Sequence, residues 1–281
     1  MSISILNNIA GLQAQNQLNL TSASLQKTLG ELSSGSRINS GADDAAGLAI
    51  ANGLQANTTA LTQSAQNATD GVGMLQVADG ALSQVTTLLN RAVTLATEAS
   101  NGTVSSAQQT SIDNEFTAIK SEITRIGSNT TYNGAQVFSG TTTSVYISDG
   151  TSQGSSSIDA SVGTLSASSI GFSGSSSVNL SSDSLTSTNS AQTALQDITK
   201  AIANVAGDRG KLGADINRLQ SATNVVNNQV QNLTSAQDSI SSANIAQDVA
   251  NMTKFNILQS TGMAALQQSN QMQQSVLRLL Q

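Results

Sequence analysis

The chain has no cysteine, histidine, proline or tryptophan, and aromatic residues make up 2% of its 281 residues. Without cysteine there is no disulfide framework and no thiol chemistry. Without histidine the usual general base and the commonest metal ligand are missing, so we expect no enzyme activity, no metal site and no cofactor. Because proline is absent, long helices need not be interrupted. The few aromatic rings favour narrow cores between helices over one wide globular core.

Charge and hydropathy exclude two further classes of protein. The formal net charge of −6 at pH 7 disfavours binding to nucleic acid, because the phosphate backbone is also anionic. No apolar run approaches the ~18 residues that are needed to span a bilayer, so we expect no membrane insertion. The N-terminus has neither a basic segment nor a continuous apolar segment, so we expect no cleaved secretory signal.

Both ends of the chain are rich in Asn, Gln, Ser and Thr and almost free of charge. Lys27 is the first charged residue, and Arg278 is the only one between Phe255 and Gln281. A solvated helix normally carries Lys and Glu on its outer face, whereas an enclosed helix avoids unpaired charge because its burial is costly. We therefore predict terminal helices that pack against other copies of the chain; the alternative is a pair of ordinary, slightly polar helices. The predicted assembly stripes contain Ile5, Ile9 and Leu12 at one end and Val276 and Leu280 at the other.

Three segments repeat apolar residues with the 3.5-residue period of supercoiled helices. They cover residues 54–96, 112–126 and 195–240, and after Ile240 the phase of the pattern slips. The slip predicts a junction between two helical layers. The sequence thus predicts a mainly α fold, a long antiparallel helical coiled-coil bundle with its terminal helices paired.

The middle of the chain differs sharply from these segments. Residues 140–190 are rich in Ser, Thr and Gly, with short β-like pieces such as Val145-Tyr146-Ile147. Asn133-Gly134 and Asp149-Gly150 are typical of hairpin turns. We predict a small β-hairpin region at the tip of the bundle; the alternative is a disordered Ser-rich linker.

The predicted domains follow from this order of segments. Residues 1–40 plus 245–281 form an inner terminal-helix domain. Residues 41–244 form a helical-bundle domain, with 132–190 as its β-hairpin, Ser/Thr-rich tip. In the free monomer we expect the ends to be disordered, because their narrow apolar stripes bury too little surface to offset the ordering cost.

Two long motifs resemble the terminal signatures of bacterial flagellin. The first is Leu-Ser-Ser-Gly-Ser-Arg-Ile-Asn-Ser at 32–40, followed by Asp-Asp-Ala-Ala-Gly-Leu-Ala-Ile-Ala at 43–51. The second runs from Asn251 through Ile-Leu-Gln at 257–259 to Val-Leu-Arg-Leu-Leu at 276–280. The resemblance covers nearly the whole chain. One departure is Gln273, where flagellins usually carry a proline. The short middle implies that there is no separate outer domain.

The resemblance implies a structural subunit of the extracellular flagellar filament, exported unfolded through the flagellar type III apparatus. The partners that it implies are other copies of the chain, an export chaperone, and hook-associated and cap proteins. One rival in the same class is the hook–filament junction protein, which shares the terminal helices. A rival from another class is a secreted adhesive or immune-modulating binding module that uses the Ser/Thr-rich region.

Two charged features lie between the predicted layers. Asp43 and Asp44 are adjacent, so their carboxylates do not converge as a catalytic pair would; we predict that Asp43 caps the following helix and that Asp44 lies in its first turn. A metal or catalytic role is the alternative. Arg37 is either a solvated loop cation or a contact to carboxylates within or between subunits, and we include it among the filament-assembly residues.

Three residues match, position by position, the flagellin contacts for a Toll-like innate immune receptor. They are Arg91, Leu95 and Glu115. Arg91 and Leu95 are four residues apart and so share a helix face. The alternative is that Leu95 packs in the bundle while the two charges form a solvated pair. Val93 and Thr94 depart from the usual pattern, in which an Arg and a Glu are common.

Overall fold

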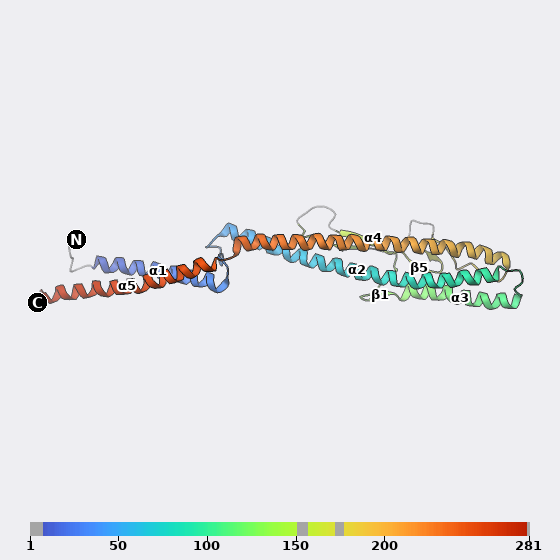
Figure 1. Ribbon diagram of the computed structural model, residues 1–281, viewed down its shortest axis with the longest axis horizontal. Helices are drawn as coiled ribbons and strands as arrows, with labels where there is room; N and C mark the ends of the chain where they lie inside the picture. The colour runs from blue at the N-terminus through green and yellow to red at the C-terminus, as the bar shows by residue number, and fades with distance from the viewer. Residues whose placement is uncertain (1–7, 151–156, 172–176, 280–281) are drawn as a thin grey trace. The chain divides into compact units, whose positions relative to one another are not determined.

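The computed structural model describes residues 8–150, 157–171 and 177–279, with side chains as far as Ser275 (Figure 1). The helices are α1 (Ile9–Ser34), α2 (Ala45–Ala99), α3 (Ser106–Asn129), α4 (Thr188–Ser241) and α5 (Ile245–Leu279). The strands are β1 (Thr131–Tyr132), β2 (Ala135–Gln136), β3 (Thr142–Tyr146), β4 (Ser157–Ser161), β5 (Leu165–Ser166) and β6 (Ser169–Ile170). The predicted mainly α fold is confirmed.

The chain divides into two units. The terminal unit comprises Met1–Ala56 and Asn232–Gln281, and the bundle unit comprises Asn57–Gln231. The terminal unit thus contains α1, α5, the first turns of α2 and the last turns of α4.

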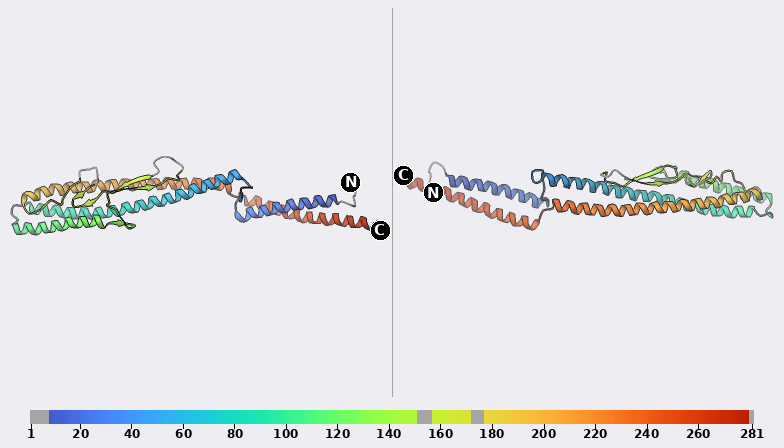
Figure 2. Two further views of the ribbon diagram at one scale, coloured as in Figure 1. Left: turned by 180° about the vertical axis from the view of Figure 1, so that it is seen from behind. Right: turned by 90° about the horizontal axis from the view of Figure 1, so that it is seen from above.

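In the terminal unit, α1 and α5 form an antiparallel pair, here called the terminal hairpin (Figures 1 and 2). Helix α1 begins after Asn8, whose Oδ1 accepts a hydrogen bond from the Gly11 amide at 2.8 Å. The same oxygen accepts a bond from the Ser269 hydroxyl at 2.9 Å, near the end of α5. Further along, Leu18 lies against Gly262. The predicted pairing of the terminal helices is confirmed.

The seam of the terminal hairpin has a strict heptad spacing. On α1 its least exposed members are Gly11, Ala14, Leu18, Thr21, Leu25, Thr28 and Leu32. On α5 they are Met252, Phe255, Gln259, Gly262, Leu266, Ser269 and Gln273. Alternating steps of three and four residues are the signature of knobs-into-holes packing. Many of these residues are small or polar, so the seam buries little apolar area.

In the bundle unit, α2 packs antiparallel to both α3 and α4. The predicted heptad residues line the core: Leu75, Leu82 and Leu89 on α2, Ile123 on α3 and Leu212 on α4 are all buried. Helix α3 starts with a capping box, in which the Ser105 hydroxyl accepts from the Gln108 amide and the Gln108 side chain accepts from the Ser105 amide. Such a box satisfies two amides that the first helical turn leaves unpaired.

A polar residue in the α4 heptads is paired across the bundle. Arg209 interrupts the apolar pattern of α4, and its guanidinium binds Asp79 of α2 in a fork, with Nε–Oδ1 at 2.7 Å and Nη2–Oδ2 at 3.2 Å. The Asp79 carboxylate accepts both hydrogen bonds and thereby raises the pKa of Arg209. This ion pair ties one position of α4 to one position of α2.

The small strands form three antiparallel pairs, β1–β2, β3–β4 and β5–β6. The predicted turn at Asn133-Gly134 joins β1 to β2, and both residues have positive φ, 49° and 78°, as a type I′ turn requires. Asp149-Gly150 lies in the connection between β3 and β4, part of which is outside the described residues.

The strand pairs lie along the flank of the bundle, not at the tip that the sequence suggested (Figure 2). Val145 of β3 contacts Gly71, midway along α2, and β5 packs on Gly127 near the end of α3. In the bundle unit, the end of α2 is instead occupied by the turn into α3 at residues 100–105. The reason is that the alternate apolar residues of these short strands need a helix surface to cover them.

Candidate assembly surface, junction and receptor contact

The surface of the terminal hairpin outside the seam, here called the outer face, carries large apolar side chains. Of the predicted assembly residues, Ile9 is 62% exposed and Leu12 is 59% exposed. Ile5 and Leu280 lie outside the described residues, and Val276 belongs to α5 but its side chain is not described. The two stripe residues whose side chains are described are therefore both uncovered within the subunit.

Further apolar residues on this outer face were not predicted from the sequence. They are Leu20 on α1 and Ile245, Val249, Ile257, Leu258, Met263 and Met272 on α5, all exposed. The heptad pattern of α5 contains a signal that could have identified them. Once the seam heptads of α5 are assigned, Val249 and Met263 share one position beside the seam, and Leu258 and Met272 share the position on its other side. The many amide side chains between them hid this pattern.

The segments that connect the helices of the terminal unit meet at a junction, here defined as residues 35–44 and 240–244. The Arg37 amide donates to the Ser241 carbonyl at 2.7 Å, and the Ala243 amide donates to the Gly35 carbonyl at 3.0 Å. Gly35 ends α1 with φ of 69°, a left-handed conformation that suits glycine. The phase slip predicted after Ile240 corresponds to the break between α4 and α5.

Arg37 contacts a carbonyl group rather than a carboxylate. Its Nη2 donates to the Ile240 carbonyl oxygen at 2.8 Å, at the C-terminal end of α4. A cation is favourable there because the last carbonyls of a helix carry partial negative charge. Within the described residues of the subunit, Arg37 therefore caps α4 and fixes the junction.

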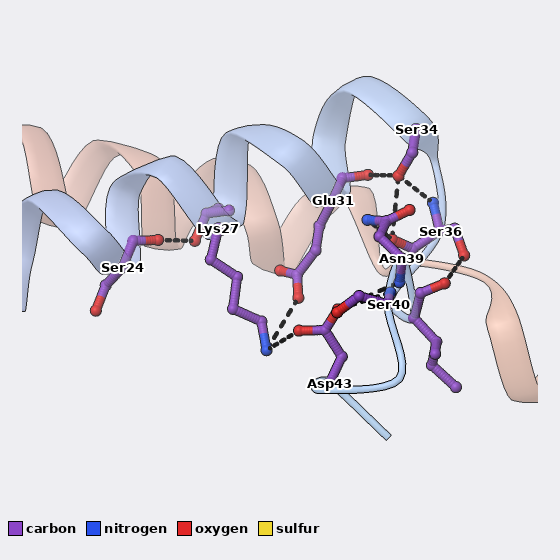
Figure 3. A network of polar contacts seen from close by, with 10 residues as sticks. Ser24, Lys27, Glu31, Ser34, Ser36, Asn39, Ser40 and Asp43 are labelled. Atoms are coloured by element: carbon purple, nitrogen blue, oxygen red, sulfur yellow. Dashed lines mark hydrogen bonds and ion pairs between the residues drawn. The ribbon is translucent and has the colours of Figure 1, made fainter. Parts of the chain in front are cut away.

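Lys27 and Asp43 lie at the centre of a polar network at the junction (Figure 3). Lys27 Nζ lies 2.8 Å from Asp43 Oδ1 and 3.9 Å from Glu31 Oε1. Asp43 Oδ2 accepts hydrogen bonds from the Ser40 hydroxyl at 3.0 Å and from the amides of Ser40 and Asn39 at 3.1 and 3.3 Å. The Lys27 hydrogen bond, followed by that from Ser40, lowers the pKa of Asp43 to about 2.

The cap of α2 is displaced by one residue from the prediction. Asp44, not Asp43, is the capping residue: its Oδ1 accepts from the Gly47 amide at 2.8 Å, and its carbonyl accepts from the Leu48 amide at 3.0 Å. Asp43 is unavailable because its carboxylate is already bound by Lys27 and the turn at residues 39–40. The contributions of Lys27 and Glu31 to this network were not predicted from the sequence, although their i, i+4 spacing on α1 is typical of a helical ion pair.

In the bundle unit, Arg91 and Glu115 form a two-point ion pair between α2 and α3. Arg91 Nε donates to Glu115 Oε1 at 2.7 Å, and Nη2 donates to Oε2 at 3.0 Å. The side chains remain 57% and 45% exposed. The Arg91 hydrogen bond lowers the pKa of Glu115. The pair presents a planar, charged surface to solvent.

Leu95 does not share that surface. Its side chain is 2% exposed and belongs to the core of the bundle unit. Leu95 and Arg91 are four residues apart on α2, but Leu95 is packed in the core while Arg91 lies at the surface. The structure thus brings Arg91 and Glu115 together at the surface and places Leu95 beneath it.

The described residues contain neither a metal site nor a membrane span. Across residues 8–150, 157–171 and 177–279, no cluster of three or more acidic residues is arranged to hold a metal ion. No helix in the same part of the chain combines the length and hydrophobicity of a membrane span.

Paired terminal helices, a coiled-coil bundle and small flanking hairpins define an α-helical structural protein. The sequence profile of the bacterial flagellin N-terminal helical region matches residues 5–143, and that of the bacterial flagellin C-terminal helical region matches residues 195–280. The chain belongs to the bacterial flagellin family, whose members are subunits of the extracellular flagellar filament.

Individual relatives agree with this assignment. The chain is 32% identical to a flagellin of Halalkalibacterium halodurans, over 98% of this chain and 99% of the relative. It is also 32% identical to a flagellin of Listeria monocytogenes, over 97% and 98%. A solved structure described as a flagellar hook-associated protein from Vibrio parahaemolyticus has a TM-score of 0.59 at 15% identity, over 71% of this chain and 100% of that chain. This last likeness concerns the fold alone.

Proposed function

We propose that this flagellin polymerises through the outer face of its terminal hairpin and that the resulting filament serves motility. One observation carries the proposal. The seam between α1 and α5 is already filled, yet large apolar side chains such as Leu12, Leu20 and Ile257 remain exposed on the outer face. Large exposed apolar side chains in this number on one helix pair support a protein contact. Repeated heterologous contacts that do not close into a ring generate a helical filament.

The composition of the hairpin supports burial of this face in the polymer. Residues 1–26 carry no charge, so packing them between subunits leaves no unpaired charge buried. Four charges of the terminal unit, Lys27, Glu31, Arg37 and Asp43, gather at the junction and bind one another or backbone groups. We accordingly propose residues 1–40 plus 245–281 as the inner domain of the filament and residues 41–244 as the domain outside it.

Purified protein offers a direct test. Seeded solutions of the wild type should form long filaments in electron micrographs, whereas Leu12→Asp should not, because it places a carboxylate in a buried contact at a cost of several kcal/mol per subunit. Leu12→Met is the matched control, since it keeps the site apolar and of similar volume. Circular dichroism should show equal helix content in all three proteins. Normal filaments from Leu12→Asp would contradict the proposal.

Family membership supports a proposal for the further partners. We propose that the chain is exported unfolded through the flagellar type III apparatus, without a cleaved signal and with the help of an export chaperone. We further propose that it assembles beneath a cap protein onto hook-associated proteins. The rival reading as a hook–filament junction protein shares the same fold. Long filaments from the purified chain alone would favour the filament subunit, and short oligomers that do not elongate would favour the junction protein.

A second proposed function is recognition by a Toll-like innate immune receptor. The observation that favours it is the exposed fork between Arg91 and Glu115. Arginine presents five donors in a rigid plane and is frequent at the centre of protein interfaces. Because Leu95 is buried, its contribution is to hold α2 in place beneath the pair. The residues Val93 and Thr94, which depart from the usual pattern, lie beside the same surface.

The receptor proposal is tested with monomer in a reporter-cell assay. Arg91→Ala should weaken signalling at least about tenfold, as expected when one partner of a desolvated charge pair is lost. The exchange Arg91→Glu with Glu115→Arg is a sharper control, because it keeps the intramolecular ion pair but reverses its polarity. Signalling that survives this exchange, or the double change to alanine, would show that the surface is only bundle exterior.

A further inference from the structure

Two of the five methionines lie exposed on the outer face of the terminal hairpin. Met263 is 47% exposed and Met272 is 56% exposed, both on α5. The other two described methionines are less accessible: Met252 is half-buried in the seam, and Met74 is half-buried against the core of the bundle unit. Met1 lies outside the described residues.

The positions of Met263 and Met272 place them on both margins of the outer face. Met263 lies two heptads after Val249, and Met272 lies two heptads after Leu258, so each methionine repeats the position of an exposed aliphatic residue. In a filament made through this face, both thioethers become buried. In the free monomer, both are open to small oxidants.

Oxidation changes the character of such a side chain. Hydrogen peroxide transfers one oxygen atom to the thioether sulfur; the O–O bond breaks, an S–O bond forms, the sulfur is oxidised and the peroxide is reduced to water. The product, methionine sulfoxide, is polar and chiral and disrupts methionine-containing interfaces. Its oxygen is a strong hydrogen-bond acceptor that an apolar contact leaves without a donor.

We propose that Met263 and Met272 are an oxidation-sensitive modification site on the assembly surface, and that their conversion to sulfoxide by peroxide prevents the monomer from polymerising. The inference rests on the proposed function, because it requires the outer face to be the polymer contact. Replacing a buried apolar contact by a polar group forfeits most of the side chain's burial free energy, so each sulfoxide should raise the critical concentration for polymerisation about tenfold or more.

The test treats purified full-length monomer with hydrogen peroxide, locates sulfoxides by peptide mass spectrometry and measures the critical concentration by sedimentation. Met263 and Met272 should oxidise before Met74, which packs against the core of the bundle unit. In preformed filaments the two outer-face residues should oxidise several times more slowly than in monomer, because the neighbouring subunits cover them. Methionine sulfoxide reductases, which act on both epimers in combination, should restore polymerisation.

The matched variant is Met263→Leu with Met272→Leu, which keeps volume and hydrophobicity and cannot be oxidised. It should polymerise normally before and after peroxide, whereas Met74→Leu should remain as sensitive as the wild type. The inference is overturned if oxidised wild type polymerises at the untreated concentration while both sulfoxides are present, or if the double variant stays equally sensitive. Failure of untreated wild type to polymerise would instead overturn the proposed function.

Discussion

Lys27 Nζ lies 2.8 Å from Asp43 Oδ1, so a cation in the last turns of α1 is fixed to a carboxylate in the connection that follows. Asp43 also accepts from the Asn39 and Ser40 amides. The ionised carboxylate therefore holds together the part of the junction that reverses the chain between α1 and α2.

This arrangement makes the junction sensitive to acid. The pKa of Asp43 is about 2 in the folded protein, below the ordinary value of 3.8. A carboxyl whose folded pKa is depressed stabilises the folded state above the unfolded pKa, and that contribution is lost as pH falls through the folded pKa. The protection of the Asn39 and Ser40 amides against hydrogen exchange, relative to the unstructured chain at the same pH, should thus fall between about pH 4 and 2. In Asp43→Asn this fall should be absent, and protection should already be lower at neutral pH.

The cause of the shift can be tested separately. Lys27→Met keeps the aliphatic stem but removes the ammonium group, which is the largest influence on Asp43. Carbon NMR titration should show the pKa of Asp43 moving up toward 3.8 while remaining below it, since Ser40 and Asn39 still donate. An unchanged titration curve would show that the turn alone sets the pKa.

Gly127 marks the closest approach of a helix to the flanking hairpins. A Cβ atom at this buried position of α3 would overlap the backbone carbonyl of Leu165. Gly127→Ala should destabilise the bundle unit by about 3 kcal/mol, because neither backbone can yield freely. Gly80→Ala is the control: α2 is open there, so alanine should stabilise by about 0.5–1 kcal/mol. Urea denaturation followed by circular dichroism measures both changes, and equal effects would refute the packing argument.

Leu95 and Arg91 should separate stability from surface recognition. Leu95→Ala removes a buried side chain and should cost about 3 kcal/mol through lost burial and a residual cavity. Arg91→Ala removes only one partner of an exposed ion pair and should leave the unfolding midpoint nearly unchanged. Thermal unfolding of both variants measures the difference. A similar loss in the two would mean that the Arg91–Glu115 fork is needed for folding of the α2–α3 pair.

The terminal hairpin should be the less stable part of the free monomer. Its seam contains Gly11, Thr21 and Thr28 as the buried residues of α1, and an isolated helix pair with so little apolar burial is marginal in water. Limited proteolysis of monomer should remove residues 1–40 and 245–281 and spare the bundle unit. Filaments should resist at the same protease concentration. Equal resistance of the ends in monomer and filament would count against this prediction.

The helices were predictable because each carries its own periodic signal. The heptads of residues 54–96 and 195–240 follow from the 3.5-residue spacing alone, and Asn133-Gly134 specifies its turn because both residues tolerate positive φ. These are local properties of the chain. Predicting them requires no information about which segments pack against them in the fold.

Features that depend on distant partners were harder to predict. Asp43 was predicted to cap α2 because the sequence does not reveal that its carboxylate is bound by Lys27. The hairpins were placed at the tip because alternation shows which strand residues are covered but not which helix covers them. Leu95 and Arg91 share a helix face by their spacing. Only the packing of the neighbouring helices decides that Leu95 is buried and Arg91 is exposed.

The Arg209–Asp79 pair selects one alignment of α4 against α2. Apolar residues recur every seven positions along both helices, so sliding α4 by a heptad would bring similar apolar residues back into contact. Such a slide would carry Arg209 about 10 Å from Asp79, and the two-point fork with its 2.7 Å contact could not form. A repetitive seam tolerates several alignments, and one polar pair suffices to favour a single register among them.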